Sequence, residues 1–315
     1  MPQLTRATVI ANAARNKRGQ AGFIEFSDDA TAASATIRAT EGKNDYPESH
    51  IKFAFDSSGG KARLELLGSK TDVDVFSHNG PLTVGSIEGK GLVDTGYRSI
   101  AVGSNDRDTE FPGLITGIAS IMKVGEGELV LENANTYSGT NGAIAGTVVL
   151  HGTLLVNNPT GSGTGTGTVL VRAGTLGGTG IIAGAVTIGD GGNQHALLIP
   201  GNANNPLASL TIESNLSFGD NAILSITIDS DTNTAAAVNA NGVTIDGAQF
   251  SINDDGSSTL PNGTVITPVR NTAATTTSGT FSNLPDGGTI TVGANSFRAN
   301  YEGGDGNDLT LTVVQ

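Results

Sequence analysis

Short runs in which apolar and polar side chains alternate recur along most of this chain, and Gly, Asn, Asp, Ser or Pro bounds each run. Alternation with a period of two is typical of a β-strand, because successive side chains point to opposite faces of a sheet. The pattern predicts strands at residues 23–26, 51–55, 127–131, 146–150, 152–156, 167–171, 185–188, 209–212, 224–228, 242–245 and 309–313. Helical spacing is not sustained anywhere, and only residues 11–18 and 63–68 have the composition for a helical turn or two.

The architecture that suits these strands is a parallel β-helix. A sandwich or barrel needs large side chains to fill a gap of about 10 Å between two layers, but residues 138–212 contain no Phe, Tyr, Trp or Met. Coils of a β-helix stack at about 4.8 Å and are filled by ladders of small aliphatic side chains. We therefore expect an all-β, right-handed parallel β-helix (β-solenoid) with glycine and asparagine at its corners and capping strands at its ends.

Charge is distributed unevenly along the chain. Residues 1–123 hold 14 basic and 15 acidic side chains, whereas residues 124–315 hold 3 basic and 15 acidic ones. Between residues 138 and 212 the only formal charges are Arg172 and Asp190. These shifts predict one continuous solenoid in four parts: a cap or docking segment at 1–20, near-neutral coils at 21–123, central repeat coils at 124–212, and acidic coils with a cap at 213–315.

Composition narrows the possible partners. The net charge of −13 argues against nucleic acid and anionic membranes, and no window approaches the eighteen apolar residues of a membrane-spanning helix. Zero cysteines exclude disulfides and thiolate sites.

Two segments carry a specific motif. Residues 122–140 read MKVGEGELVLENANTYSGT and residues 152–157 read GTLLVN. They resemble the autotransporter-associated β-strand repeat, whose pattern is K-x-G-x-G-x-L-x-L-x-x-x-N-T-Y-x-G followed by G-T-L-x-V. Residues 82–89, 100–105 and 111–117 look like the run-in of that repeat, and residues 296–311 are similar to the closing segment of such passengers. The resemblance implies a right-handed parallel β-helix displayed outside a bacterial cell, as an adhesin or a surface stalk.

Candidate catalytic groups are few. Asp72 and Asp74 alternate so that both carboxylates face the same side of a strand, an arrangement that glycosidases and calcium sites use; the alternative is an exposed strand kept soluble by charge. The four histidines are widely separated without metal-ligand spacing and are expected at solvated positions: His50, His78, His151 and His195. Because β-helices that cleave polysaccharides cluster charged side chains on one face, the uncharged centre argues against an enzyme. No catalytic residue is expected.

Calcium is the only cofactor that the sequence suggests. Residues 303–308 read GGDGND and look like the calcium-binding nonapeptide of the β-roll, although only one copy is present and Thr310 occupies an apolar position. The calcium candidates are therefore Asp305 and Asp308, and no other cofactor is expected. Asp229, Asp231 and Asn233 begin like an EF-hand loop but lack its later ligands, which predicts a turn. The glycine-rich loops 85–91 and 161–167 and the sequons at Asn215 and Asn262 are expected to be structural or incidental.

Three functions remain. The first is an extracellular, non-catalytic bacterial surface scaffold or adhesin that binds a surface or glycan ligand along one face. The second is a subunit of an extracellular fibre, assembled as a homo-oligomer through end-to-end or edge-strand contacts. The third is a carbohydrate-active enzyme on the same fold, which requires a groove with clustered carboxylates and aromatics.

Overall fold

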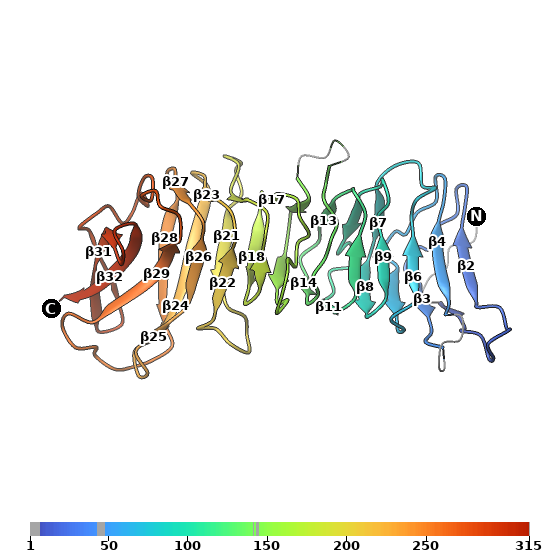
Figure 1. Ribbon diagram of the computed structural model, residues 1–315, viewed down its shortest axis with the longest axis horizontal. Coiled ribbons are helices and arrows are strands. Elements are labelled where there is room, and N and C mark those ends of the chain that lie inside the picture. Colours follow the sequence, from blue (N-terminus) through green and yellow to red (C-terminus); the bar gives the residue numbers. More distant parts are fainter. Residues whose placement is uncertain (1–6, 43–47, 141, 143–144, 315) are drawn as a thin grey trace. The chain divides into compact units, whose positions relative to one another are not determined.

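The regular structure formed by the described residues is β-strand (Figure 1). The computed structural model describes residues 7–42, 48–140, 142 and 145–314, and every helix or strand assigned within those ranges is a strand. The chain divides into two compact units, Met1–Leu154 with Asn158–Thr168, and Leu155–Asn157 with Val169–Gln315. The all-β prediction is confirmed, and each run predicted from alternation contains a strand. Residues 1–6 of the predicted N-terminal cap lie outside the described residues.

Three stacks of parallel strands form most of the first unit. The first sheet runs β1 (Thr8–Ala11), β3 (Thr36–Ala39), β5 (Arg63–Leu66) and β8 (Ser86–Gly89). The second runs β2 (Phe23–Phe26), β4 (His50–Phe53), β6 (Asp72–Asp74), β9 (Leu92–Asp94) and β12 (Leu114–Thr116). The third includes β7 (Leu82–Val84), β10 (Ile100–Val102), β13 (Ile121–Lys123) and β15 (Thr147–Val149), while β11 (Thr109–Phe111) pairs with β14 (Glu128–Leu131). Strand β16 (Thr153–Val156) spans the boundary between the units.

Identical register from coil to coil builds the core of this unit. Ile51, Val73, Val93 and Ile115 are paired in sequence across β4, β6, β9 and β12, and each is at most 1% exposed. Because the strands pair in register, every second residue stacks on its equivalent one coil away. The inward ladders of aliphatic side chains confirm the predicted β-solenoid.

The second unit also begins as stacked parallel strands. One stack includes β17 (Val169–Val171), β20 (Val186–Ile188), β23 (Leu216–Phe218) and β27 (Val243–Ile245). Another includes β18 (Gly174–Gly178), β21 (Ala196–Pro200), β24 (Ala222–Asp229) and β28 (Gln249–Asp254), with β25 (Thr234–Ala235) antiparallel to β24. The third runs β19 (Ile181–Ile182), β22 (Ser209–Ile212), β26 (Ala237–Ala240) and β29 (Val265–Asn271).

Antiparallel strands end the third stack of this unit. Strand β32 (Asp308–Val314) pairs antiparallel with β29, followed by β31 (Asn295–Gly303) and β30 (Thr289–Val292). That these C-terminal strands cap the solenoid stays a prediction. In the first unit, β1 pairs in parallel with β3.

The suggestion of helical turns at residues 11–18 and 63–68 was wrong. Arg63–Leu66 forms strand β5, in which Leu64 and Leu66 are buried. Pairing with β3 and β8 outweighs the helix propensity of Leu, Glu and Arg, since propensity is a weak prior beside tertiary contacts. Residues 15–19 form bends and turns after β1.

Candidate binding surface

Four large apolar side chains stand in solvent at one corner of the first unit. Phe55, Phe76, Tyr97 and Ile118 are 51%, 59%, 50% and 39% exposed, and each lies 21 residues after the one before. We call these four residues the corner ladder. The chain has only ten Phe, four Tyr and no Trp, so three of its rare rings lie together where the hydrophobic effect disfavours them. Exposed apolar groups that gather in this way mark interaction sites.

The corner ladder is aligned by one sheet. Its residues follow the ends of β4, β6, β9 and β12 by two or three positions, and these strands are hydrogen-bonded neighbours in that order. Adjacent strands lie about 4.8 Å apart, so four successive positions span roughly 14 Å across the strands. The corner ladder therefore forms a narrow apolar strip that crosses four coils.

Aspartates fix the turns that carry the strip. Asp74 Oδ1 accepts a hydrogen bond from the backbone N–H of Phe76 at 2.7 Å, and Asp94 Oδ1 accepts one from Gly96 N–H at 2.9 Å. Gly96 and Gly117, with φ of +51° and +108°, directly precede the last two ladder residues. A side chain there would be strained, and glycine lets the chain turn so that the next side chain leaves the corner.

The two central rings also touch each other. The ring centroids of Phe76 and Tyr97 lie 5.4 Å apart at an interplanar angle of 63°, an edge-to-face contact. Both rings nevertheless remain at least half exposed. Their mutual contact fixes the rings in place without removing them from solvent.

The outward face of the adjoining strands carries paired charges. Asp72 and Asp74 are both half-buried on that face, with buried Val73 between them, as the alternation predicted. Asp72 forms an ion pair with His50 on the neighbouring strand. The two carboxylates are therefore divided between different partners, one a histidine and the other a backbone turn, and do not stand as a free catalytic pair.

One histidine departs from its predicted environment. His50, His151 and His195 are exposed, but His78 is only 6% exposed, so the solvated position predicted for it was wrong. Its Nε2 lies 2.6 Å from the carbonyl oxygen of Ser57, and its Nδ1 lies 2.7 Å from that of Gly80. The imidazole thus joins two corner loops and plays a packing role.

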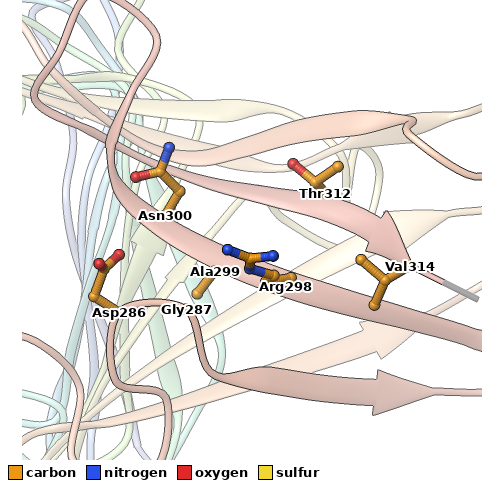
Figure 2. Close-up of a pocket in the computed structure, with 7 residues that line it drawn as sticks. All are labelled: Asp286, Gly287, Arg298, Ala299, Asn300, Thr312 and Val314. Carbon is orange, nitrogen blue, oxygen red and sulfur yellow. The ribbon is translucent and has the colours of Figure 1, made fainter.

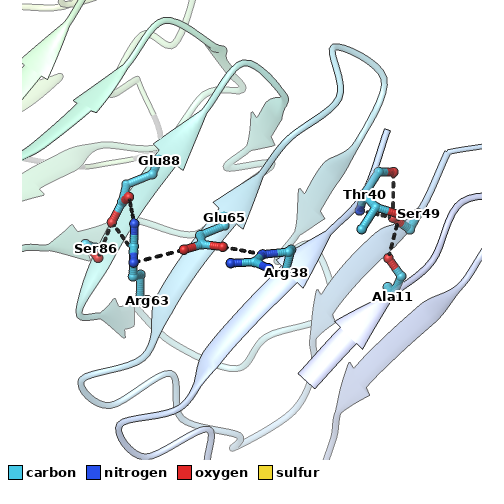
Figure 3. Close-up of polar contacts among 8 residues, drawn as sticks. All are labelled: Ala11, Arg38, Thr40, Ser49, Arg63, Glu65, Ser86 and Glu88. Atoms are coloured by element: carbon cyan, nitrogen blue, oxygen red, sulfur yellow. Dashed lines mark hydrogen bonds and ion pairs between the residues drawn. The ribbon is translucent and has the colours of Figure 1, made fainter. Parts of the chain in front are cut away.

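A second charged surface lies on the first sheet (Figure 3). Arg38 Nε donates to Glu65, while Arg63 lies 3.0 Å from Glu65 and donates from Nε to Glu88 Oε1 at 2.6 Å. The hydrogen bond to Glu88 raises the pKa of Arg63. The side chain of Glu65 is only 6% exposed because it lies between the two guanidinium groups. This alternation of charge neutralises the sheet surface.

Further acidic side chains lie next to Glu88 of that network. Glu88, Asp108, Glu110 and Glu128 line an open pocket of about 470 Å³. Burial, followed by the charges of Asp108 and Glu110, raises the pKa of Glu128. Within the ranges that the structure describes, no three His, Asp or Glu side chains are arranged to hold a metal ion. The pocket is a carboxylate cluster that sequence reasoning missed, and its walls carry no aromatic ring.

The calcium candidates lie in a hairpin. Asp305 is exposed in the turn between β31 and β32, and Asp308 Oδ1 accepts a hydrogen bond from Asn271 N–H at 2.9 Å. Because β31 and β32 are antiparallel, the segment differs from the parallel coils of a β-roll. Calcium binding by Asp305 and Asp308 stays a prediction.

A shallow pocket lies on the same terminal sheet (Figure 2). Its volume is about 380 Å³, and it contains one carboxylate and one guanidinium. Asp286 Oδ1 already accepts the backbone N–H of Tyr301 at 3.1 Å. The pocket therefore offers no pair of carboxylates for acid–base chemistry. The lining residues are Asp286, Gly287, Arg298, Ala299, Asn300, Thr312 and Val314.

The remaining motifs occupy turns and surface positions. Asp229, Asp231 and Asn233 lie at the turn between β24 and β25, as predicted. Asp231 accepts hydrogen bonds from the neighbouring 257–258 segment, which lower its pKa. The sequon residues Asn215 and Asn262 are exposed.

The lysine of the repeat motif is buried at a corner. Lys123 is 1% exposed, and its Nζ donates to the carbonyl oxygens of Val124 and Gly125, both at 2.8 Å, and of His151 at 3.2 Å. Burial lowers its pKa to about 8. The ammonium group joins backbone carbonyls of two successive coils, which is a structural role.

Asparagine and tyrosine of the same motif connect further coils. Asn135 accepts from Ile115 N–H at 2.8 Å and donates to the carbonyl oxygen of Gly163 at 2.6 Å. The hydroxyl of fully buried Tyr137 lies 2.6 Å from Thr147 Oγ1, and burial raises its pKa. The lysine, asparagine and tyrosine of the most specific motif thus stabilise the stacking of coils.

Comparison with known proteins gives one partial relative. The chain is 37% identical over 115 residues to a protein of Brucella suis biovar 1 (strain 1330) described as "Adhesin BmaC autotransporter". The match covers 34% of this chain and 3% of the relative, so the chain spans only a small part of that protein's length. No family model matches the chain. The partial likeness and the β-solenoid fold are consistent with a passenger-like repeat protein.

The corner ladder was missed although the sequence contains a signal for it. Its residues recur at intervals of 21, close to the length of one coil, whereas alternation with a period of two marks only the strands. A search for large apolar residues at the coil period would have found them.

Proposed function

We propose that this chain is a non-catalytic, adhesive β-solenoid segment of a bacterial cell-surface or extracellular protein. In this proposal the stacked coils form a rigid support, and contact with a target is made by the corner ladder. The observation that carries the proposal is the placement of three rings and one isoleucine in solvent at equivalent positions of four coils. The partial likeness to an autotransporter adhesin supports the same interpretation.

The carboxylate pocket and the rings of the corner ladder lie on separate surfaces of the first unit, which argues against glycoside hydrolysis. General acid–base hydrolysis of a glycoside needs a carboxyl pair across the scissile bond and a surface that holds the sugar ring. The carboxylate pocket around Glu110 and Glu128 has no aromatic wall, while Asp74 and Asp94 beside the corner ladder each accept a backbone N–H of their own turn. We expect no release of reducing sugar from polysaccharides, and hydrolysis that Glu128→Gln abolishes would overturn this part.

Adhesion is tested with the full chain on defined surfaces. Labelled protein is applied to fixed epithelial cells, immobilised fibronectin and collagen, and insoluble polysaccharides, and the retained fraction is measured after washing. We expect retention on at least one surface, and we expect Phe76→Ser combined with Tyr97→Ser to abolish it. Retention on none of them would refute the proposal.

A matched control lies on the same sheet. Phe23 is 57% exposed at the start of β2 and does not belong to the corner ladder. Phe23→Ser removes an equally exposed ring, so it should leave retention unchanged. Equal loss in this variant and the double variant would show non-specific hydrophobic sticking and contradict the role of the corner ladder.

A further inference from the structure

The surroundings of the corner ladder indicate the chemistry of its ligand. We propose that it binds a neutral polysaccharide whose chain lies across the strands, with successive sugar rings against successive ladder side chains. This inference rests on the proposed adhesive function and names the ligand class of the same surface.

The shape of the strip suits an extended sugar chain. Ladder positions advance by about 4.8 Å per coil along roughly 14 Å, which is close to the advance of one monosaccharide along an extended polysaccharide. The C–H face of a pyranose packs on an aromatic face, as other apolar groups do. Phe76 and Tyr97 are held by their mutual contact, so little side-chain freedom is lost when a chain binds.

Hydrogen-bond acceptors lie beside the rings. One oxygen of Asp74 and one of Asp94 bond the backbone turns, and among the described residues no protein group bonds the second oxygen of either. Sugar hydroxyls are donors that match these free oxygens. An apolar strip edged by acceptors is the combination that a polyhydroxylated ring with an apolar face requires.

The charge at this corner selects against polyanions. Asp56, Asp74 and Asp94 adjoin the ladder, and Arg98, next to Tyr97, is the cation closest in sequence. Two further charged pairs on the strands, His50 with Asp72 and Lys52 with Glu25, are already matched. The excess of negative charge would repel uronic acid, sulfate and phosphate groups.

The same charges argue against a second copy of the chain as the occupant. In a two-fold symmetric contact the same patch meets itself, so the three aspartates of one copy would lie close to those of the other. Like charges opposed in this way cost several kcal/mol. A neutral polysaccharide avoids that repulsion.

Binding is tested by native gel electrophoresis of the full chain in polysaccharide-containing gels and by pull-down on insoluble polysaccharides. The neutral probes are amylose, hydroxyethylcellulose, insoluble β-1,3-glucan and chitin; the anionic probes are polygalacturonate and heparin. We expect at least one neutral probe to bind and neither anionic probe to do so. Phe76→Ser and Tyr97→Ser should each weaken binding about tenfold, the usual order for truncating a central aromatic.

Three further variants distinguish the contribution of the ladder rings to sugar binding from that of the aspartates. Phe23→Ser should bind normally, and Tyr97→Phe should bind within about twofold because the ring is kept. Asp74→Asn combined with Asp94→Asn keeps side-chain oxygens that accept the backbone N–H groups of the turns. Because it removes two negative charges, it should allow polygalacturonate to bind. Circular dichroism confirms that each variant is folded.

The outcomes distinguish this inference from the proposed function. Binding to cells or matrix proteins that depends on the corner ladder, without binding to any neutral polysaccharide, would overturn the sugar inference and leave adhesion intact. Sedimentation that shows a dimer lost in Tyr97→Ser would assign the ladder to a second copy and also overturn it. Retention on no surface at all would remove both proposals together.

Discussion

Asn135→Ala tests whether the repeat motif stabilises the solenoid. Asn135 is 3% exposed, and its amide bonds the N–H of Ile115 in one neighbouring coil and the carbonyl oxygen of Gly163 in another. Alanine removes both hydrogen bonds, because it lacks the side-chain amide, and it leaves a small cavity where the amide was. The N–H of Ile115 and the carbonyl oxygen of Gly163 that remain are both buried.

The expected magnitude follows from these two contacts. An unsatisfied buried donor or acceptor costs about 1–3 kcal/mol, so the two together should lower the free energy of unfolding by about 2–6 kcal/mol. A water molecule that enters the cavity and bonds both groups would hold the loss near the lower value. Asn133→Ala is the matched control, because Asn133 bonds the carbonyl oxygen of Pro112 at an exposed position; we expect it to cost less than about 1 kcal/mol.

Guanidinium titration followed by far-ultraviolet circular dichroism gives the loss of stability. Because stacked repeats can unfold locally, amide hydrogen exchange is measured in parallel. Protection should fall in peptides that contain Ile115 and Gly163 and stay unchanged in β24 and β28. If Asn135→Ala and Asn133→Ala lose the same free energy, the bridging role assigned to Asn135 is wrong.

Three other changes follow from the buried polar groups. Tyr137→Phe removes the hydroxyl that contacts Thr147 and should cost about 1 kcal/mol in a denaturant titration. The pKa of Lys123 falls from 10.5 to about 8 on folding, so the unfolded chain binds more protons between these values and stability rises with pH through that window. Urea titrations at pH 7 and pH 10 should show this rise in the wild type and not in Lys123→Met. Glu65→Gln leaves two arginines facing each other and should cost about 1.5–3 kcal/mol by thermal or chemical unfolding, a loss that an unchanged melting curve would contradict.

The fold could be predicted because a solenoid repeats its local rules. Val186, Thr187 and Ile188 alternate inward and outward as their sequence indicates, and the same holds for most predicted strands. The strand at residues 63–66 was not predicted because Arg, Leu and Glu suit a helix equally well, and only pairing with strands 23 to 27 residues away decides the outcome. The antiparallel pairing of β31 and β32 depends on the same kind of long-range information.

The candidate surface was harder to predict because exposure at a corner depends on backbone direction. Ile51, Phe53 and Phe55 occupy alternate positions of one apolar run, which predicts that all three point inward. Strand β4 ends at Phe53, and Phe55 has a φ of +55°, so the chain turns and the ring is left in solvent. Alternation gives the correct face only while the strand continues.

The repeat motif and the corner ladder therefore carry different information. Lys123 and Asn135 are buried and bond backbone carbonyls of neighbouring coils, and buried Tyr137 bonds the side chain of Thr147, so a sequence that keeps them keeps the coil. Phe76 and Tyr97 contribute little to that packing, since each is at least half exposed. A likeness carried by the motif is thus evidence for the fold, whereas binding is decided by residues that can change without altering the coil. Proteins that share the motif but differ at the corner positions should accordingly share stability and differ in what they adhere to.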